Sequence, residues 1–393
     1  MRVVLTHDFF ETFGGAERVT AEIAAAFPEA SVHAILGRRS VAARMGIEDR
    51  VSAILPERPV LLEHYRVLAP MYPALVRAAR LPEADLLIAS SYAYAHAFAT
   101  KNQAPKLCYC HGPFRHLWSQ QEVYAAQLRG GCLARMAFSA YARAARAADR
   151  AGAASVDAFL TQSPYTAGLI KRAYGREAEV LPPPVDCALF HPSGRPGDGY
   201  FLFAGRFVDA YKRPSILLEA FAAMPERRLL LAGDGPALAS LRRRATSNVE
   251  FLGRLDDRDL VAVMQGCEAA LFPSVDDFGL VPLEVNACGR PVLALRAGGA
   301  LHTVRPGVTG EWLEEQSAQA LIRAVEAFDG TRYDPQAIRQ HAEQWDKDAF
   351  RRRIRAAADR VVGSTRSSPV SQTAGSAQAP IDVQTSSSPR SGS

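Results

Sequence analysis

Short apolar segments recur along the chain and alternate with longer stretches that carry apolar residues at helical spacing. The pattern begins with RVVLTH (2–7), which is followed by a helical stretch from about Ala16 to Phe27. The later apolar segments are SVHAIL (31–36), DLLIASS (85–91), KLCYCH (106–111), AFLTQS (158–163), AEVLPPP (178–184), YFLFAG (200–205), RLLLAG (228–233), VEFLG (249–253), AALFPS (269–274) and PVLAL (291–295). Short strands that alternate with helices are typical of parallel sheets covered on both faces. The sequence therefore predicts an α/β fold.

The alternation stops in the middle of the chain, over the Pro- and Gly-rich segment VLPPPVDCALFHPSGRPGDG. We interpret residues near 182–198 as a linker between two α/β domains. The length of 393 residues agrees with this, since a domain commonly has about 100–200 residues. We expect one domain over residues 1–184 and a second over 185–362. Residues 363–393 are rich in Ser, Pro, Gly and Thr and are predicted to be a disordered tail.

The net charge of +5 is unevenly distributed along the chain. Residues 1–180 carry 21 Lys and Arg against 16 Asp and Glu, so the whole excess lies in the first half. This asymmetry favours an anionic partner for the N-terminal half. Nucleic acid is not expected to be that partner, because no familiar nucleic-acid-binding motif accompanies the charge.

The cysteines and the N-terminus indicate a cytoplasmic protein. The six cysteines show no C-x-x-C pair and no Cys/His group of the kind that a zinc site needs. They are Cys108, Cys110, Cys132, Cys187, Cys267 and Cys288. We interpret them as buried, reduced thiols. The N-terminal MRVVLTH turns polar too early for a secretory signal or a spanning helix, so we expect the mature protein to begin at Met1.

Two candidate ligand-binding turns lie in the N-terminal half. FFETFGGAERV places Gly14 and Gly15 between the first strand and the first helix, where backbone N–H groups can approach a phosphate or a sugar. A plain tight turn would use the same two glycines, and the motif is not the G-x-G-x-x-G of a dinucleotide site. LCYCHGPFRHLW places His111 at the carboxyl edge of the sheet, where open α/β folds bind ligands. A structural role for this single histidine is the alternative.

Two cations and a glycine turn open the C-terminal half. FLFAGRFVDAYKRPSILLEAF contains a strand, then Gly205, Arg206 and Lys212 ahead of a helix. This arrangement suits a diphosphate leaving group, whose negative charge grows as the bond to it breaks. Solvated surface charge is the alternative, and we prefer it for Arg213. Asp257–Asp259 has the D-x-D form of a metal motif, but acids at a helix start commonly cap N–H groups, so we favour capping and predict no metal site.

Three carboxylates gather in FPSVDDFGLVPLE, where a predicted strand leads into a helix. Asp276 and Glu284 are separated by seven residues and bracket a Phe-Gly turn and Pro282, which is tolerated in a first helical turn. Carboxylates at this junction would face the same cleft as the two cations and suit the vicinal hydroxyls of a sugar and a ribose. Helix capping by Asp276 or Asp277 is the alternative.

In their order along the chain, these motifs resemble those of retaining GT-B glycosyltransferases that use nucleotide sugars, of the glycogen-synthase-like group 1 type. The resemblance covers about residues 1–350 and implies two Rossmann-like domains whose parallel sheets face each other across a cleft. It also implies that a helix near 337–360 crosses back towards the first domain. The N-terminal domain would bind the acceptor and the C-terminal domain the nucleotide sugar.

The resemblance also implies roles for individual residues. The implied catalytic residues are His111, Arg206, Lys212 and Asp276. The implied donor-binding residues are Gly14, Gly15, Gly205, Asp277, Phe278, Gly279, Leu280, Glu284, Gly298 and Gly299. Glu284 would bind the ribose, and ALRAGGALHTV resembles the family's phosphate loop. In two places the chain departs from the family: Asp276 replaces its first glutamate, and His302 stands where an acid often follows the glycine pair. Each departure could alter the preference for the donor sugar or the rate of transfer.

Within this family, THDFFETFGGAERV, APMYP, YCHGPFRHLW, SPYTAGLIKRAYGREAEVLPPPVD and DDFGLVPLEVNACG look most similar to bacterial mannosyltransferases of O-antigen and exopolysaccharide assembly. This similarity implies metal-independent transfer of mannose from GDP-mannose to a polyprenyl-diphosphate-linked saccharide, without a cofactor. Residues 60–81 interleave Leu, Tyr, Met and Val with arginines, which suits peripheral contact with the inner face of the plasma membrane. An ordinary core-facing helix is the alternative for that segment.

Two other functions remain open for the same architecture. A sugar-nucleotide epimerase would need acid/base carboxylates beside the sugar and would turn over without an acceptor. A noncatalytic sugar-nucleotide-binding or scaffold protein would bind GDP tightly without turnover, and the set of Arg206, Lys212 and Glu284 argues against it.

Overall fold

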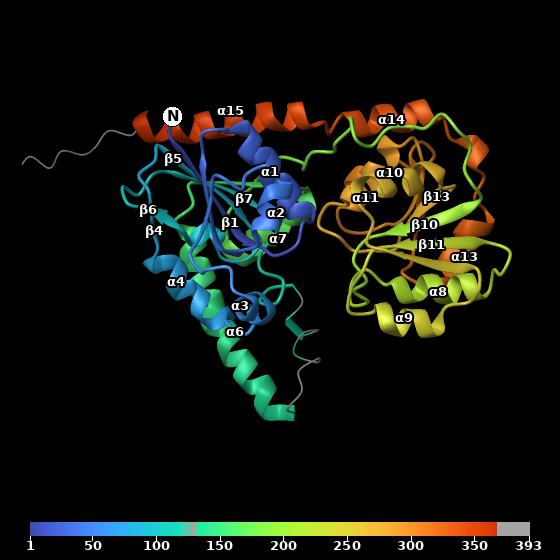
Figure 1. Cartoon of the computed structure of the whole chain (residues 1–393), viewed down its shortest axis with the longest axis horizontal. Helices are drawn as coiled ribbons and strands as arrows, with labels where there is room; N and C mark the ends of the chain where they lie inside the picture. Colours follow the sequence, from blue (N-terminus) through green and yellow to red (C-terminus); the bar gives the residue numbers. More distant parts are fainter. Residues whose placement is uncertain (120, 123–124, 126–130, 368–393) are drawn as a thin grey trace, which may run out of the picture.

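The computed structural model describes residues 1–119, 121–122, 125 and 131–367. These residues form two α/β domains, each built around one parallel sheet, with helices α14 and α15 running along one side of both (Figure 1). The predicted fold of two Rossmann-like domains with parallel sheets is therefore confirmed.

The N-terminal sheet has the strand order β3-β2-β1-β5-β7-β8-β9, and all its pairings are parallel. Its strands are β1 (Val3–Phe10), β2 (Ser31–Gly37), β3 (Val51–Ala53), β5 (Leu86–Ser91), β7 (Lys106–Cys110), β8 (Ala158–Thr161) and β9 (Glu179–Val180). A separate pair joins β4 (Arg80–Leu81) to β6 (Ala99–Thr100). Every residue of β1, β5 and β7 is buried, as expected for strands covered on both faces.

Helices cover both faces of this sheet. Alternate residues of each strand point to opposite sides, so the apolar side chains on each face form a core of their own. Leu5 belongs to a core that α1, α2 and α15 complete, whereas Val4 belongs to a core on the other face. The helices of the domain are α1 (Gly15–Ala26), α2 (Arg39–Arg44), α3 (Pro59–His64), α4 (Tyr72–Ala78), α6 (Gly131–Ala154) and α7 (Pro164–Tyr174), with short turns η1 (Ala69–Met71) and η2 (Ala95–Ala97).

The C-terminal sheet has the parallel order β12-β11-β10-β13-β14-β15. Its strands are β10 (Tyr200–Ala204), β11 (Arg228–Ala232), β12 (Val249–Gly253), β13 (Ala269–Phe272), β14 (Val292–Leu295) and β15 (Gly310–Leu313). Its helices are α8 (Pro214–Ala222), α9 (Leu238–Arg244), α10 (Asp257–Gly266), α11 (Leu280–Ala287), α12 (Ala300–Thr303), α13 (Ala318–Glu326) and α14 (Pro335–Glu343), with the turn η3 (Gly330–Arg332). One face packs on α8, α9 and α13, and the other on α10, α11, α12 and α14.

The last helical segment differs from the single helix expected near 337–360. It consists of α14, which contacts α11 in the C-terminal domain, and α15 (Lys347–Ser367), which contacts α1 in the N-terminal domain (Figure 1). Phe350 and Ile354 of α15 are buried in the core beneath the N-terminal sheet. Burial of this apolar face holds α15 on the first domain.

The linker, the C-terminal tail and the cysteines were also predicted from the sequence. In the segment near 182–198 that was interpreted as a linker, Val185 and Phe190 are buried in the core of the C-terminal domain. Helix α15 continues past the expected boundary at residue 362 to Ser367, and the rest of the predicted tail, 368–393, lies outside the described residues. The free, buried cysteines agree with the expected thiols, while the side chain of Cys132 lies outside the described part. They are Cys108, Cys110, Cys187, Cys267 and Cys288.

Candidate active site

The glycine turn of the N-terminal domain touches the acidic turn of the C-terminal domain. Gly14 precedes α1, and its N–H donates to Oε2 of Glu17 at 2.9 Å, which fixes the turn. A Cβ added at Gly15 would lie 3.3 Å from Cδ1 of Leu280, at the start of α11. The absence of a side chain at Gly15 therefore lets the two domains approach each other here.

His111 follows β7 at the carboxyl edge of the N-terminal sheet and is buried. Its Nε2 lies 2.8 Å from Oγ of Ser90, which in turn lies 2.7 Å from Oγ1 of Thr20. Burial, and secondarily the nearby His7, lower the pKa of His111 to about 3. The imidazole is therefore neutral near pH 7 and suited to hydrogen bonding rather than to supplying a positive charge.

The acidic turn between β13 and α11 binds cations from both domains. Asp276 forms an ion pair with Lys212 of its own domain, and its other oxygen, Oδ1, is buried without a hydrogen-bond partner among the described residues. Asp277 forms an ion pair with Arg115 of the N-terminal domain. The residue that precedes α11 at the cap position is Gly279, with φ of 90° and no side-chain cap, so the capping alternative for Asp276 and Asp277 is wrong.

Backbone contacts at Asp277 reinforce this junction between the domains. Its carbonyl oxygen accepts hydrogen bonds from the hydroxyls of Ser163 and, at 3.2 Å, Thr166, both at the start of α7. A Cβ added at Gly112, next to His111, would lie 3.4 Å from Oδ2 of Asp277. The histidine turn and the acidic turn are therefore in direct proximity.

Glu284 lies on α11 and is buried. Burial raises the pKa of its carboxyl group, Arg18 on α1 partly offsets that increase, and Asp257 adds to it. A buried carboxylate close to the opposite domain is suited to accept hydrogen bonds from a ligand held between the domains.

The remaining predicted donor residues line the same end of the C-terminal sheet. Gly299 packs on Phe278 so closely that an added Cβ would lie 2.1 Å from its Cα. The N–H of Gly299 donates to the carbonyl of Asp276 at 2.8 Å, so in this structure it supports the acidic turn instead of pointing at an open site. Arg206, beside Gly205, is exposed, and no side-chain hydrogen bond or ion pair joins it to another described residue.

The D-x-D segment has a different role from the one expected. The side chain that caps α10 is Asp256, which accepts from the N–H of Asp259 at 2.9 Å, so the capping interpretation of Asp257 is wrong. Asp257 instead bridges the domains, because Arg18 and Arg44 each lie 2.9 Å from its Oδ1. Within the described part of the chain, no group of three or more His, Cys, Asp or Glu residues is arranged to hold a metal ion.

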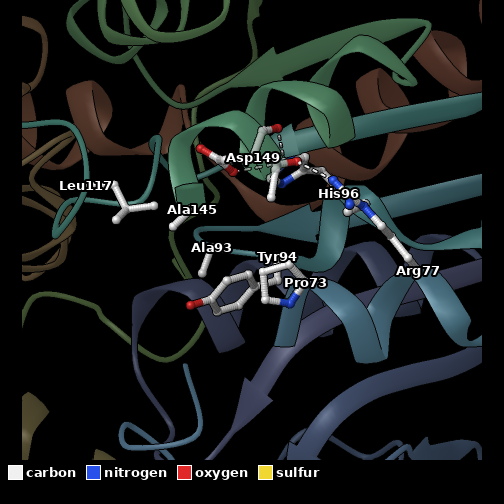
Figure 2. Close-up of a pocket in the computed structure, with 10 residues that line it drawn as sticks. Pro73, Arg77, Ala93, Tyr94, His96, Leu117, Ala145 and Asp149 are labelled. Atoms are coloured by element: carbon white, nitrogen blue, oxygen red, sulfur yellow. Dashed lines mark hydrogen bonds and ion pairs between the residues drawn. The ribbon is translucent and has the colours of Figure 1, made fainter. Parts of the chain in front are cut away.

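A second buried polar cluster lies inside the N-terminal domain, away from the acidic turn. Figure 2 shows His96 of η2 and Asp149 of α6 directed toward each other, with Nε2 and Oδ1 3.1 Å apart. Asp149 also accepts from Trp118 Nε1 at 2.6 Å and from the Tyr174 hydroxyl at 2.9 Å. The adjoining cavity of about 10 Å³ has room for about one water molecule, so this cluster is structural.

Several residues that join the two domains were not predicted from the sequence. They are Arg18, Arg44, Arg115, Ser163 and Thr166. Arg115 lies within the motif HGPFRHLW that supplied His111, which was the one available signal. The partners of the other four lie more than a hundred residues away in sequence, so no local pattern could reveal them.

Comparisons with known proteins agree with this architecture. Residues 190–345 match the family model described as "Glycosyl transferases group 1", and residues 13–189 match the one described as "Glycosyltransferase Family 4". The crystal structure of the Anabaena protein HepE in complex with UDP superposes with a TM-score of 0.70 at 20% identity, covering 92% of this chain and 100% of that one. This likeness shows a shared GT-B fold.

Curated relatives match over part of the chain. The D-inositol 3-phosphate glycosyltransferase of Mycobacterium leprae is 38% identical over 162 residues, which are 36% of this chain and 38% of that protein. The GDP-mannose-dependent monoacylated alpha-(1-6)-phosphatidylinositol monomannoside mannosyltransferase of Corynebacterium glutamicum is 33% identical over 181 residues, 38% of this chain and 47% of that protein. Each match thus spans less than half of the relative. Because the two family models match consecutive segments from residue 13 to residue 345, the chain belongs to the group 1 glycosyltransferases of the GT-B fold.

Proposed function

We propose that this protein transfers a sugar from a nucleotide-sugar donor to a saccharide acceptor, with retention of configuration and without a metal ion. The observation that carries this proposal is the junction of the two domains, where the neutral His111 and the pair Lys212–Asp276 lie beside the acidic turn. The reacting end of a sugar diphosphate needs a cation, a hydrogen-bond acceptor and a neutral hydrogen-bonding ring. Lys212, Oδ1 of Asp276 and His111 supply these three groups.

Each residue has a distinct part in the proposed transfer. The bond between the anomeric carbon and the diphosphate oxygen breaks, the acceptor oxygen forms the new bond, and its proton passes to the departing phosphate. Lys212 and Arg206 stabilise the charge that develops on the diphosphate. Oδ1 of Asp276 accepts a hydrogen bond from a hydroxyl of the transferred sugar, and His111 holds the same sugar. Glu284 accepts from the ribose hydroxyls.

We propose GDP-mannose as the donor. Support comes from the similarity of the motifs to bacterial mannosyltransferases and from the relative in Corynebacterium glutamicum, whose name specifies GDP-mannose. The Anabaena structure contains UDP, so a uracil nucleotide is the alternative to test. Under this proposal GDP-mannose raises the melting temperature more than UDP-glucose does, because binding to the native state stabilises it. A larger shift with UDP sugars would overturn the choice of donor.

Product analysis without an acceptor tests the reaction class itself. A transferase leaves the sugar of GDP-mannose in its original configuration when no acceptor is present, whereas an epimerase converts it. A protein that binds GDP tightly and never turns over with any acceptor would match the noncatalytic alternative instead.

The acceptor is proposed to be lipid-linked and reached from the membrane surface, as part of surface polysaccharide synthesis. The segment from α3 to α4 buries Leu62 and Tyr72 but leaves Val60, Val67 and Met71 exposed by 68%, 75% and 54%. Exposed arginines accompany these side chains, which suits an interface with anionic lipid. No helix in the described residues is long and apolar enough to span a membrane. Failure to bind anionic liposomes at low salt would remove this part of the proposal.

A further inference from the structure

A network of buried hydrogen bonds runs from His111 into the first helix of the N-terminal domain, through Ser90 and Thr20 to the backbone of Ala16. Nε2 of His111 lies 2.8 Å from Oγ of Ser90, and this oxygen lies 2.7 Å from Oγ1 of Thr20 on α1. Oγ1 of Thr20 lies 2.8 Å from the carbonyl oxygen of Ala16, one turn earlier in the same helix. Ser90 and Thr20 are completely buried. The donors and acceptors of this His111 network therefore decide among themselves where each proton lies.

The carbonyl group of Ala16 sets the direction of donation in the network. Two oxygens 2.8 Å apart need a proton between them, and a carbonyl oxygen carries none, so the hydroxyl of Thr20 donates to Ala16. A hydroxyl has only one proton to donate, so Thr20 accepts from the hydroxyl of Ser90. Ser90 has then used its own proton and must accept from His111. The ring proton of His111 therefore lies on Nε2.

The neighbouring His7 on β1 excludes the other possible acceptor for the Thr20 proton. Nδ1 of His7 lies 3.0 Å from the carbonyl oxygen of Ser90, so this nitrogen carries a hydrogen and donates it. Nδ1 of His7 also lies 3.1 Å from Oγ1 of Thr20, but a protonated nitrogen cannot accept from that hydroxyl. Every contact of the network thus agrees with donation in one direction, from His111 towards Ala16.

The other ring nitrogen of His111, Nδ1, remains available to a ligand. The imidazole is neutral near pH 7, because its pKa is about 3, so it has a single N–H group and an electron pair on the second nitrogen. Nδ1 has no hydrogen-bond partner among the described residues, and it is not completely buried. It can therefore accept a hydrogen bond from a ligand but cannot donate one.

We infer that Thr20 and Ser90 fix His111 as the Nε2–H tautomer, so that its Nδ1 accepts a hydrogen bond from a hydroxyl of the transferred sugar. The contact with the sugar rests on the proposed function, whereas the tautomer rests on the buried network alone. Thr20 and Ser90 are positioning residues, since they act through His111. A site of this kind rejects a donor in which hydrogen replaces the contacted hydroxyl, because the nitrogen then loses its partner.

Nitrogen-15 NMR of the full chain, labelled at histidine, measures the tautomer without any donor, since protonated and unprotonated ring nitrogens resonate in separate regions. The signals of His111 are identified by their loss in His111→Asn. We expect the proton on Nε2 in the wild type. Thr20→Val removes the acceptor of the Ser90 proton, which is then free to turn towards Nε2, so the Nδ1–H form of His111 should appear.

Two further variants make this measurement specific. Thr20→Ser keeps the hydroxyl and should keep the wild-type tautomer. Thr161→Val is the matched control, because the hydroxyl of Thr161 is also completely buried and donates to a carbonyl, that of Cys110, at 2.8 Å. It should leave the tautomer of His111 unchanged. A proton on Nδ1 in the wild type, or an unchanged tautomer in Thr20→Val, would overturn the inference.

Kinetics with analogues of GDP-mannose that each lack one hydroxyl test the contact with the sugar. The wild type should discriminate most strongly against one analogue. Thr20→Val should lower kcat/KM for the complete donor about tenfold and reduce the discrimination against that analogue by a similar factor, as for loss of one hydrogen bond. Thr20→Ser should restore both values. A merely structural role for Thr20 would instead lower kcat/KM for every donor alike, and equal discrimination in the wild type and in Thr20→Val would refute the contact. Absence of turnover with any donor would overturn the proposed function and the sugar contact with it, whereas the NMR result decides the tautomer independently.

Discussion

The ion pair between Arg115 and Asp277 joins the two domains at the acidic turn, and its removal should open the cleft. Arg115 also stacks on Tyr211 of the C-terminal domain, with its guanidinium 5.1 Å from the ring centre. The side chains of Arg115 and Asp277 are 31% and 16% exposed, so both charges are largely desolvated while the domains are closed. We therefore expect Arg115→Met to remove the main cationic partner of Asp277 in this arrangement, with Lys212 left as the weaker one.

The size of the effect follows from this burial. Removing one partner of a buried ion pair costs about 3–5 kcal/mol, and the partial exposure of Arg115 favours the lower end of that range. A loss of about 3 kcal/mol decreases the ratio of closed to open molecules by more than about a hundredfold. Replacing both partners, in Arg115→Met with Asp277→Asn, removes the unpaired charge and should restore most of the closed population.

Small-angle X-ray scattering of the four proteins in this double-mutant cycle measures the closed population through the radius of gyration. Each single variant should be more extended than the wild type, and the double variant should resemble the wild type. Arg360→Met is a suitable control, because Arg360 and its partner Glu179 are 57% and 55% exposed and such pairs contribute only about 0.2–1 kcal/mol. A wild-type radius of gyration in Arg115→Met would show that the other interdomain contacts, such as those of Asp257 with Arg18 and Arg44, hold the domains together without this pair.

Three further predictions concern the proposed donor site and His111. Lys212→Ala should lower kcat about 100-fold, or about 3 kcal/mol, with a smaller effect on GDP affinity; a folded variant with wild-type kcat would exclude the site. Glu284→Gln should weaken GDP binding, because the buried ribose hydroxyls lose a charged acceptor, and calorimetry showing equal affinity would contradict this role. The pKa of His111 is about 3 in the folded protein, against 6.5 for a free side chain. Below about pH 6.5 the unfolded state therefore binds more protons than the folded state. The free energy of unfolding should decrease as the pH falls from there towards 3. Denaturant unfolding of His111→Asn should show a shallower loss over that range, and equal pH dependence in both proteins would contradict the buried neutral imidazole.

The sheets could be predicted from sequence because their central strands are buried on both faces. Segments such as LLIA (86–89) and FLFA (201–204) have no polar position, so a short apolar run between helical stretches was sufficient evidence. The edge strands β3 and β15 were missed, since one spans three residues and the other contains Glu311 and Trp312 with only partial burial. Edge strands have weaker apolar patterns because solvent covers part of them.

The first strand shows a second limit of the pattern. The sequence turns polar at Thr6, His7 and Asp8, yet β1 continues to Phe10 with all three side chains buried. The Asp8 carboxylate accepts four backbone N–H groups from residues 92–95, at 2.5–3.1 Å. Burial of a charged residue was possible only because a distant loop supplies its hydrogen bonds, and no local pattern contains that information.

Within the candidate site, local motifs identified residues at turns but not the partners that these residues bind. Gly14, Gly15 and Asp276 each lie in a turn that follows a predicted strand. Residue type and position were therefore enough to select them from the sequence. The structure adds that Asp257 and Asp277 each bind arginines of the opposite domain. The charge of a residue is visible in the sequence, whereas its partner depends on how the two domains dock.

The arrangement of charge on the acidic turn explains why adjacent carboxylates are tolerated where a strand leads into a helix. Burial raises the pKa of Asp277, Arg115 opposes that increase, and the neighbouring Asp276 adds to it. Lys212 comes from the same domain as the two acids, so it remains beside Asp276 whether the cleft is open or closed. Arg115 reaches Asp277 only when the domains meet. With the domains apart, the turn would carry excess negative charge, which disfavours a diphosphate, whereas the docked arrangement neutralises that charge with a cation from the other domain. We therefore expect binding of an anionic donor and docking of the two domains to favour each other.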